Sequence, residues 1–364
     1  MSENKKVAFC IPSLGSGGAE RVTSILANKF AERGYDVSII MLCHDTCLYP
    51  LSESVKTVCL NCDNDAAMSF AKRFLTRLKK IRRAIGEIAP DVVVSFMSET
   101  NIDVCLALWG INVPIIVSER NDPATDPASR AKQLLRKVAY TKPRGFVFQT
   151  PDAQAYFSKR IQKRSDIILN PLGKAMPWRF EGERDKRIVA VGRLNKQKNF
   201  TMLIDAFSEF AKIHPDRVLE IYGEGVLEGK IKEYIAEKEL QEKVILKGFC
   251  RDVHEKILTA EMFVMSSDFE GMPNALLEAM ALGLPCISTD CPCGGPRMLI
   301  ESYKNGILVP VKDAKAMTKA MCFMADEPDA AEQMSKNAVL VRERADLESV
   351  AQQWLDMVNL CKER

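Results

Sequence analysis

Two glutamates eight positions apart, Glu270 and Glu278, have the residue type and spacing to bind a ligand rich in hydroxyls. A carboxylate can accept hydrogen bonds from two neighbouring hydroxyls, as on a sugar or a ribose. An apolar run at 262–265 predicts a buried parallel strand before Glu270, and the Ala-, Leu- and Met-rich stretch 275–282 predicts a helix around Glu278. Glu270 is therefore expected in a loop at the carboxyl end of a strand, where open parallel sheets bind ligands.

Two cations, Arg193 and Lys198, occupy a similar loop about seventy residues earlier. The apolar run 187–191 predicts a strand before them, and the stretch 200–213 predicts a helix after them. Arginine can bind a phosphate with two parallel hydrogen bonds, and lysine adds a point charge. The pair is consistent with a pyrophosphate site. On spacing alone, these cations and the two glutamates could equally well be solvated side chains on the surface.

These motifs resemble the donor site of the family 4 retaining glycosyltransferases. The resemblance lies in Ser266-Ser267, in Glu270-Gly271-Met272-Pro273-Asn274, in Leu277 to Pro285, and in Gly192, Arg193, Lys198 and Asn199. It implies catalytic roles for Arg193, Lys198 and Glu270. It also implies a donor-binding set made of Gly17, Gly18, Gly192, Gly223, Cys250, Arg251, Val253, Gly271, Met272, Pro273, Asn274, Leu277 and Glu278.

The same resemblance implies an α/β protein of the GT-B fold, with two Rossmann-like domains facing each other across a cleft. The expected acceptor-binding domain is 1–170, completed by a terminal helix at 346–364. A linker at 171–184 would lead to a donor-binding domain at 185–345. The implied reaction transfers a hexose or N-acetylhexosamine from a UDP-sugar to a saccharide acceptor, with retention and without a metal or cofactor. Similarity to bacterial polysaccharide and lipid-linked-oligosaccharide enzymes implies a lipid-pyrophosphate-linked acceptor in cell-surface glycan synthesis.

A glycine-rich turn at 15–18 follows the first predicted strand, 7–11, and leads into a predicted helix at 19–32. Backbone amides at such a turn can approach an anion closely. The turn is not a dinucleotide fingerprint, because Glu20 stands where the third glycine would be. In the family, this loop lies beside the donor pyrophosphate and the acceptor. A plain strand–helix connection remains an alternative.

The stretch 70–87 predicts an amphipathic helix with an unusually basic face. Arg73, Arg77, Lys80 and Arg83 could hold an anionic acceptor or an anionic membrane surface. A second basic stretch at 130–144 supports this interpretation. A solvated face over a core stripe is the alternative.

The loop 118–123 also follows a predicted strand, and Glu119, Arg120 and Asn121 are candidate acceptor residues. Many family members carry a histidine near the position of Arg120, so the role of this arginine is open. A simple turn at Asn121-Asp122-Pro123 is the alternative.

Composition narrows the class of protein further. The 364 residues suffice for two domains, and 47% hydrophobic with 27% charged residues is typical of a globular protein. Charge is uneven, at +7 over 1–170 and −4 over 171–364, which suggests an anionic partner for the first half. No nucleic-acid module accompanies this charge.

No apolar run reaches the ~20 residues of a membrane span, and the polar start predicts no secretory signal. A cytoplasmic protein is expected, either free or peripheral on the inner face of the plasma membrane. Twelve cysteines and three histidines show no zinc-site spacing. Two other classes remain open: a GT-B enzyme of different chemistry, such as a sugar-nucleotide epimerase, and a non-catalytic protein that binds nucleotide sugars or membranes.

Overall fold

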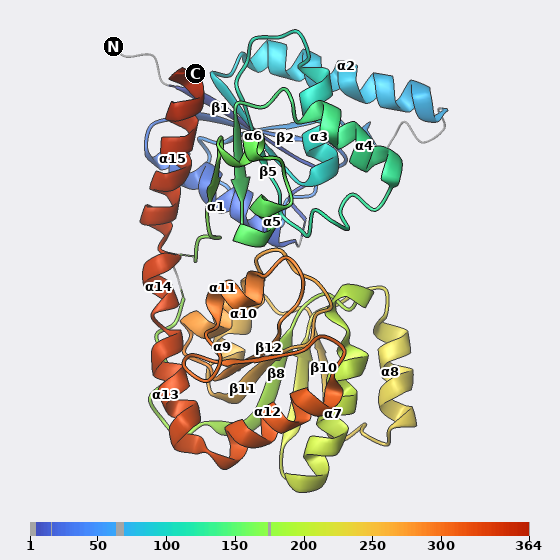
Figure 1. Ribbon diagram of the computed structural model, residues 1–364, viewed down its shortest axis with the longest axis vertical. Helices are drawn as coiled ribbons and strands as arrows, with labels where there is room; N and C mark the ends of the chain where they lie inside the picture. Colours follow the sequence, from blue (N-terminus) through green and yellow to red (C-terminus); the bar gives the residue numbers. More distant parts are fainter. Residues whose placement is uncertain (1–4, 16, 63–68, 174–175, 364) are drawn as a thin grey trace. The chain divides into compact units, whose positions relative to one another are not determined.

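The computed structural model describes residues 5–15, 17–62, 69–173 and 176–363 (Figure 1). The chain forms two compact units. The first comprises Met1–Pro171 and Leu347–Arg364, and the second comprises Leu172–Asp346. The segment predicted as a linker, 171–184, thus belongs almost wholly to the second unit, whose first strand begins at Asp185. Ser16, in the predicted glycine-rich turn, lies outside the described residues.

The first unit contains a parallel sheet of seven described strands in the order β3-β2-β1-β4-β5-β6-β7. The strands are β1 (Lys6–Ile11), β2 (Asp36–Met41), β3 (Lys56–Cys59), β4 (Val92–Phe96), β5 (Ile115–Ser118), β6 (Gly145–Phe148) and β7 (Ser165–Ile167). Central strands such as β4 and β5 are buried along their whole length. Their continuous apolar runs follow from this burial, because helices cover both faces of the sheet.

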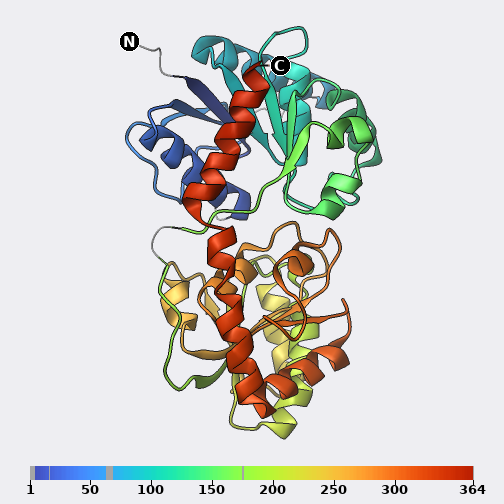
Figure 2. The same cartoon turned by 60° about the vertical axis from the view of Figure 1, so that its left-hand side comes forward.

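The helices of the first unit are α1 (Gly18–Glu32), α2 (Phe70–Ile88), α3 (Ser98–Ala107), α4 (Arg130–Ala139), α5 (Pro151–Ala155), α6 (Lys159–Gln162) and α15 (Leu347–Glu363). Helix α15 ends the chain but packs beside β4 and β5, next to α1 (Figure 2). Its Trp354 is 1% exposed and lies 5.5 Å from the ring of Phe96. The last helix therefore completes the core of the first unit.

The second unit contains a parallel sheet of six described strands in the order β10-β9-β8-β11-β12-β13. The strands are β8 (Asp185–Val191), β9 (Val218–Tyr222), β10 (Val244–Gly248), β11 (Ala260–Met265), β12 (Cys286–Thr289) and β13 (Ile307–Val309). The chain order reverses at β8, between β9 and β11. Loops at the carboxyl ends on either side of such a switch point diverge and leave room for a ligand.

The helices of the second unit are the short 3₁₀ helix η2 (Lys196–Lys198), α7 (Phe200–Ile213), α8 (Glu228–Glu237), α9 (Val253–Ile257), α10 (Asn274–Ala281), α11 (Gly295–Leu299), α12 (Ala314–Asp326), α13 (Pro328–Ala338) and α14 (Val341–Arg344). The predicted strand–helix alternation is confirmed in both units. Helices α3, α4, α8 and α12 are additions to the sequence-based prediction. No helix in the described part of the chain is long and apolar enough to cross a membrane.

Candidate active site

Lys198 and Glu270 form an ion pair at the carboxyl ends of two neighbouring strands. Lys198 follows β8 and Glu270 follows β11, and these strands pair directly in the sheet. The Nζ atom of Lys198 lies 2.5 Å from Oε1 of Glu270, and the side chains are only 14% and 9% exposed. Ser267 Oγ donates to Oε1 at 2.7 Å, and Gln197 Nε2 donates to Oε2 at 3.2 Å. The buried carboxylate therefore has donors on both oxygens.

Further hydrogen bonds hold the two loops together. Ser266 Oγ donates to the carbonyl oxygen of Lys198 at 2.8 Å, and the amide of Asp268 donates to the carbonyl oxygen of Gln197 at 2.8 Å. Asn199, in the left-handed region at φ 45°, caps α7 and donates from Nδ2 to Asp268 Oδ1 at 2.8 Å. Lys198 and Glu270 are thus held by backbone as well as by side chains, which keeps their geometry preset.

Arg193 differs from Lys198 in its surroundings. Its side chain is exposed, and its guanidinium makes no hydrogen bond or ion pair with any residue that the structure describes. The predicted pair of cations therefore consists of one lysine fixed against a carboxylate and one arginine with all its donors available. Five donors in a planar fork suit a phosphate group.

Three glycines allow the strand-end loops to approach one another. A Cβ atom on Gly192 would lie 3.0 Å from Cε of Lys198, so the lysine stem lies directly over this glycine. Gly223, at φ +139°, has no room for a Cβ, which would lie 2.1 Å from the carbonyl oxygen of Gly192. Its amide donates to the carbonyl oxygen of Gly248 at 2.8 Å. Packing between loops therefore requires glycine at the predicted donor position Gly223, whereas at Gly192 the lysine stem would have to give way.

Glu278 lies in α10 and contacts a residue that the sequence did not suggest. The Nε2 atom of His254 lies 2.8 Å from Oε2 of Glu278, and the two side chains are 16% and 13% exposed. His254 belongs to α9, which follows the loop containing Cys250 and Arg251 and begins at Val253. The predicted nucleotide-binding loop and the second glutamate are therefore joined through this histidine.

A pocket of about 400 Å³ adjoins His254. Its lining residues are Met176, Pro177, Arg251, Asp252, His254 and Glu255. All six belong to the second unit. The pocket lies on the α9 side of Glu278, so a ligand that binds this carboxylate has an adjacent hollow for a further group.

The turn before α10 is buried. Residues 271–273 are inaccessible, and the side chain of Leu277 is 1% exposed. A Cβ on Gly295 would lie 1.8 Å from the carbonyl oxygen of Gly271, so the turn packs tightly against α11. The predicted donor contacts here are consequently limited to backbone groups and to Asn274, which begins α10 and is half-buried.

In the first unit, Gly17 precedes α1 and Gly18 begins it. The carboxylate of Glu20 folds back over this turn, since a Cβ on Gly17 would lie only 2.0 Å from Glu20 Oε2. The hydroxyl of Tyr49 donates to the carbonyl oxygen of Gly17 at 3.2 Å. A carboxylate stabilises the positive end of a helix, so Glu20 takes a position that an anion would otherwise favour.

Glu119 points into the interior of the first unit. Its side chain accepts hydrogen bonds from Ser98 Oγ at 2.6 Å and from the hydroxyl of Tyr140, and Arg136 lies 3.9 Å away. Burial raises the pKa of this carboxyl. The structure therefore surrounds the predicted acceptor residue with protein partners, and its role in acceptor binding stays a prediction.

Arg120 is also built into the first unit. Its Nη1 donates to Asn170 Oδ1 at 2.7 Å, and its guanidinium lies 4.5 Å from the ring centre of Phe96 and 5.6 Å from that of Trp354. Burial lowers the pKa of this arginine. Asn121, the third candidate in this loop, is half-buried. Arg120 thus ties α15 to the sheet, whatever it does for an acceptor.

The four predicted cations of α2 differ in their surroundings. Arg77 Nη1 lies 3.0 Å from Oδ2 of Asp103 in α3, with side chains 25% and 9% exposed. Lys80 Nζ reaches a carbonyl oxygen outside the helix at 3.5 Å, and Arg83 pairs at 2.7 Å with a glutamate four residues on. The side chain of Arg73 makes no hydrogen bond with described residues. Arg77 therefore anchors the helix, whereas Arg73 is half-buried and Arg83 is exposed.

Two family models together match most of the chain. The model described as glycosyl transferases group 1 matches residues 177–340, and the glycosyl transferase 4-like domain matches residues 17–173. The chain belongs to the family 4 glycosyltransferases.

Known relatives cover the whole length of this glycosyltransferase. An α-1,4-N-acetylgalactosaminyltransferase of Campylobacter jejuni, named for a GalNAc-GalNAc-diNAcBac-PP-undecaprenol, is 26% identical over 97% of this chain and 98% of its own. A second Campylobacter jejuni enzyme is 28% identical over 94% of this chain and 95% of its own. It is a 4-α-N-acetylgalactosaminyltransferase named for an N-acetylgalactosamine-N,N'-diacetylbacillosaminyl-diphospho-undecaprenol.

Solved structures share the fold of this glycosyltransferase. Anabaena HepE, in complex with UDP and glucose, has a TM-score of 0.83 at 16% identity, and the alignment covers 98% of this chain and 100% of that one. Two Rossmann-like domains of the GT-B type, as expected from the sequence, are thereby confirmed.

Several polar residues of the glycosyltransferase site were missed from its sequence. Gln197 and Ser267 bond to Glu270, Asn195 accepts from the amide of Lys198 at 3.2 Å, and His254 contacts Glu278. The first three lie within three residues of a predicted site residue, so their closeness in sequence to that residue could have identified them. His254 is likewise next to the predicted residue Val253, but nothing in the sequence pointed to its contact with Glu278, which lies 24 residues further on. Within the described ranges, no three His, Cys, Asp or Glu side chains gather as a metal site.

Proposed function

We propose that this enzyme transfers a hexose or N-acetylhexosamine from a UDP-sugar to a lipid-pyrophosphate-linked saccharide, with retention and without a metal. The Lys198–Glu270 pair at the switch point of the second sheet carries the proposal. The buried carboxylate can accept hydrogen bonds from hydroxyls of the donor sugar, and the fixed ammonium beside it can bind a phosphate. Both groups therefore lie where the loops after β8 and β11 meet. The UDP complex of Anabaena HepE and the undecaprenol-linked substrates in the names of the two Campylobacter relatives support the choice of substrates.

Glu270 keeps capacity for one further donor. Its Oε1 accepts from Lys198 and Ser267, while Oε2 accepts from Gln197 alone among the described residues. A carboxylate has about four acceptor positions, so Oε2 can take a hydroxyl of the donor sugar. Glu278, held in place by His254, would bind the ribose on the other side of the α10 turn.

Charge on the leaving diphosphate grows as the glycosidic bond breaks. Lys198 and Arg193 would stabilise that charge, and the Lys198 ammonium needs little reorganisation because Glu270 and the loop backbone already hold it. The leaving phosphate would accept the proton of the acceptor hydroxyl. The α2 cations, above all Arg73 and the exposed Arg83, would bind the acceptor pyrophosphate or an anionic membrane surface and so make the enzyme peripheral on the inner face of the plasma membrane.

A panel of UDP-sugars with an undecaprenyl-pyrophosphate-linked saccharide, scored by released UDP, tests the proposed reaction. Turnover with UDP-hexoses or UDP-N-acetylhexosamines is expected, and turnover with GDP-mannose alone would contradict it. NMR of the product should show the anomeric configuration of the donor. Activity should survive EDTA, and a loss that magnesium or manganese restores would contradict metal independence.

Reversing Arg73 and Arg83 to glutamate tests the role of α2. We expect weaker binding to anionic liposomes and a higher KM for the acceptor, most clearly at low salt where screening is weak. UDP affinity should stay unchanged. Lys163→Glu, an exposed lysine of the first unit outside α2, is the matched control. Unchanged liposome binding and KM would leave α2 as a solvated face.

A further inference from the structure

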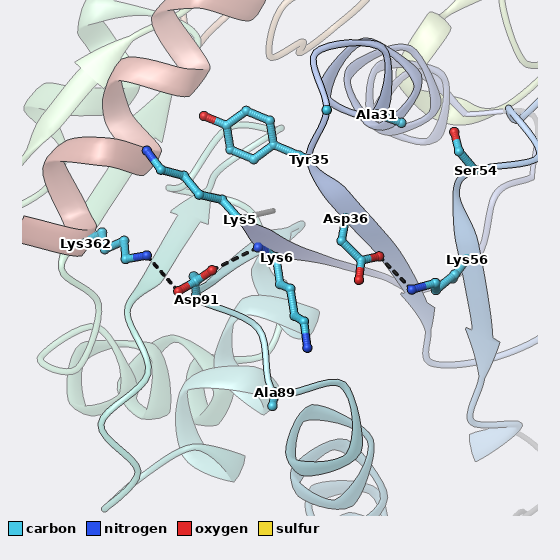
Figure 3. Close-up of a pocket in the computed structure, with 11 residues that line it drawn as sticks. Lys5, Lys6, Ala31, Tyr35, Asp36, Ser54, Lys56, Ala89, Asp91 and Lys362 are labelled. Atoms are coloured by element: carbon cyan, nitrogen blue, oxygen red, sulfur yellow. Dashed lines mark hydrogen bonds and ion pairs between the residues drawn. The ribbon is translucent and has the colours of Figure 1, made fainter. Parts of the chain in front are cut away.

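A second pocket, separate from the proposed active site, lies at the amino-terminal edge of the first sheet (Figure 3). Its volume is about 610 Å³, within the usual range for small-molecule sites. It is lined by Lys5, Lys6, Ala31, Gly34, Tyr35, Asp36, Ser54, Lys56, Ala89, Asp91 and Lys362. Gly17 and Gly18 follow the opposite end of β1, about 15–20 Å away for a six-residue strand. The pocket is therefore remote from the glycine turn of this unit.

Four lysines from separate parts of the chain meet two aspartates in this pocket. Lys56 Nζ pairs with Asp36 at 2.7 Å, and Lys362 Nζ pairs with Asp91 at 2.8 Å. Asp91 also accepts the backbone amide of Lys6 at 2.9 Å. Both carboxylates are therefore neutralised, and they hold two lysines in place rather than repelling an incoming anion (Figure 3).

The other two lysines have no carboxylate partner among the described residues. Lys5 Nζ donates to the neutral Asn359 at 2.8 Å, and the ammonium of Lys6 makes no hydrogen bond with the described part of the chain. The lining side chains thus carry a net charge of +2. An excess of positive charge along a concave surface attracts anions, and a bound dianion would balance it.

We infer that this pocket binds a small phosphomonoester of a polyhydroxylated compound, such as a sugar phosphate. A phosphomonoester carries close to two negative charges at neutral pH, which matches the excess of the lining. Lys6 would bind the phosphate, while Lys5, whose side chain points the opposite way toward Asn359, would add to the positive charge of the site. Asp36 and Asp91 would accept ligand hydroxyls, since each retains acceptor positions beyond its lysine. The size of the pocket exceeds that of inorganic phosphate and leaves room for the sugar.

The site draws on both ends of the chain. Lys5 and Lys6 lie at the start of β1, and Lys362 lies near the end of α15, so a ligand here would join the terminal helix to the first strand (Figure 1). A ligand that binds only the folded protein stabilises it, so binding should also raise the melting temperature.

Calorimetric titration of the full-length chain with glucose 6-phosphate, at constant ionic strength, tests the inference. Stoichiometric binding is expected, with weaker binding of inorganic phosphate and none of glucose. Lys6→Gln should weaken glucose 6-phosphate binding about 10-fold, the loss of one charge-assisted contact, without removing a partner from either aspartate. Lys6→Arg should restore affinity to within about 3-fold, because the charge returns.

Two further variants separate this pocket from other anion sites. Glu278→Gln, in the proposed donor site, and Lys163→Gln, on the surface of the first unit, should both bind glucose 6-phosphate as the unmodified chain does. Absence of binding to the unmodified chain would overturn the inference. Equal affinity of Lys6→Gln and the unmodified chain, or loss of binding in Glu278→Gln, would overturn it as well.

Discussion

Lys198 combines a structural contact with its proposed chemical role, whereas Arg193 has no comparable contact. Glu270 is buried and accepts from Lys198, Ser267 and Gln197. Removing the lysine would leave a buried carboxylate with only neutral donors, which is costly. Arg193 is exposed, and its loss leaves no described group unpaired. The two cations should therefore differ in their effect on stability, although both should matter for catalysis.

Lys198→Ala should lower the free energy of unfolding by about 2 kcal/mol, and Arg193→Ala should change it by no more than about 0.5 kcal/mol. The double variant Lys198→Ala/Glu270→Ala should lose less than the sum of the single variants, by about 1 kcal/mol, because the pair is removed together. Urea denaturation of the unmodified chain, of the single variants at 193, 198 and 270, and of the double variant measures these changes. Additive losses would mean that the ion pair does not stabilise the unit.

The same two cations should each be needed for turnover. Lys198→Ala or Arg193→Ala should lower kcat by about 10²–10³, as found when one preset donor to a developing anion is removed. Steady-state kinetics with the donor found in the UDP-sugar panel gives the values. A variant that raises KM but keeps kcat would place its cation in ground-state binding only.

Substitutions of the two glutamates should have different effects on transfer and on UDP binding. Glu270→Ala should abolish transfer and leave UDP affinity nearly unchanged, since its expected partner is the sugar. Glu278→Ala should weaken UDP binding, and His254→Ala should do so to a smaller extent because His254 only holds the carboxylate. Titration of UDP into the three variants by calorimetry separates these roles. Equal loss of UDP affinity in Glu270→Ala and Glu278→Ala, with the fold intact, would refute the assignment.

At the scale of elements, the site depends on how closely three strand-end loops can pack. The loops after β8, β9 and β10 meet through Gly192, Gly223 and Gly248. Gly223 combines a positive φ with a carbonyl oxygen in the place of its missing Cβ, so a side chain there must displace the loop that carries Lys198. Backbone packing therefore connects the glycine turns to the position of the lysine.

Gly223→Ala should cost at least about 2 kcal/mol and should also reduce kcat, because strain at a positive φ and a steric clash act together. Gly229→Ala is the matched control, since that glycine lies in α8 and a Cβ added to it would meet no heavy atom within 4 Å. It should be neutral or stabilise by up to about 1 kcal/mol. Chemical denaturation and steady-state kinetics would show both effects, and a harmless Gly223→Ala would refute the packing argument.

At the scale of the whole molecule, the chain returns to its first unit after completing the second. Helix α15 places Trp354 against Phe96 and beneath the guanidinium of Arg120. Val350, Ala351 and Val358 of the same helix are also buried in this core. The last eighteen residues therefore contribute to the stability of a unit whose other residues precede 172.

Truncation after Asp346 should destabilise the first unit selectively. Hydrogen exchange should accelerate in β4 and β5, which lose the cover of α15, and should stay slow in β8 and β11. Trp354→Ala in the full chain should lower stability by about 3 kcal/mol, the usual cost of emptying a buried aromatic site. Uniform acceleration in both units would show instead that the units unfold together.

Local sequence determined much of this protein. Buried parallel strands need continuous apolar runs, and many strand–helix turns contain glycine, so the alternation of strands and helices could be predicted from these patterns. The two Rossmann-like units were implied by the resemblance to the family 4 glycosyltransferases. The positions of Glu270, Lys198 and Arg193 in loops at strand ends followed from the same patterns, because a loop between a predicted strand and a predicted helix has only one place in such a sheet.

Tertiary structure alone decided which of these groups meet. The strand order brings β8 beside β11, and so Lys198 to Glu270, across 72 residues of chain. It also brings His254 to Glu278 and turns Glu119 inward to Tyr140. Residue patterns report short-range propensity and burial, whereas these contacts depend on which strands pair and on how side chains share the space between packed elements.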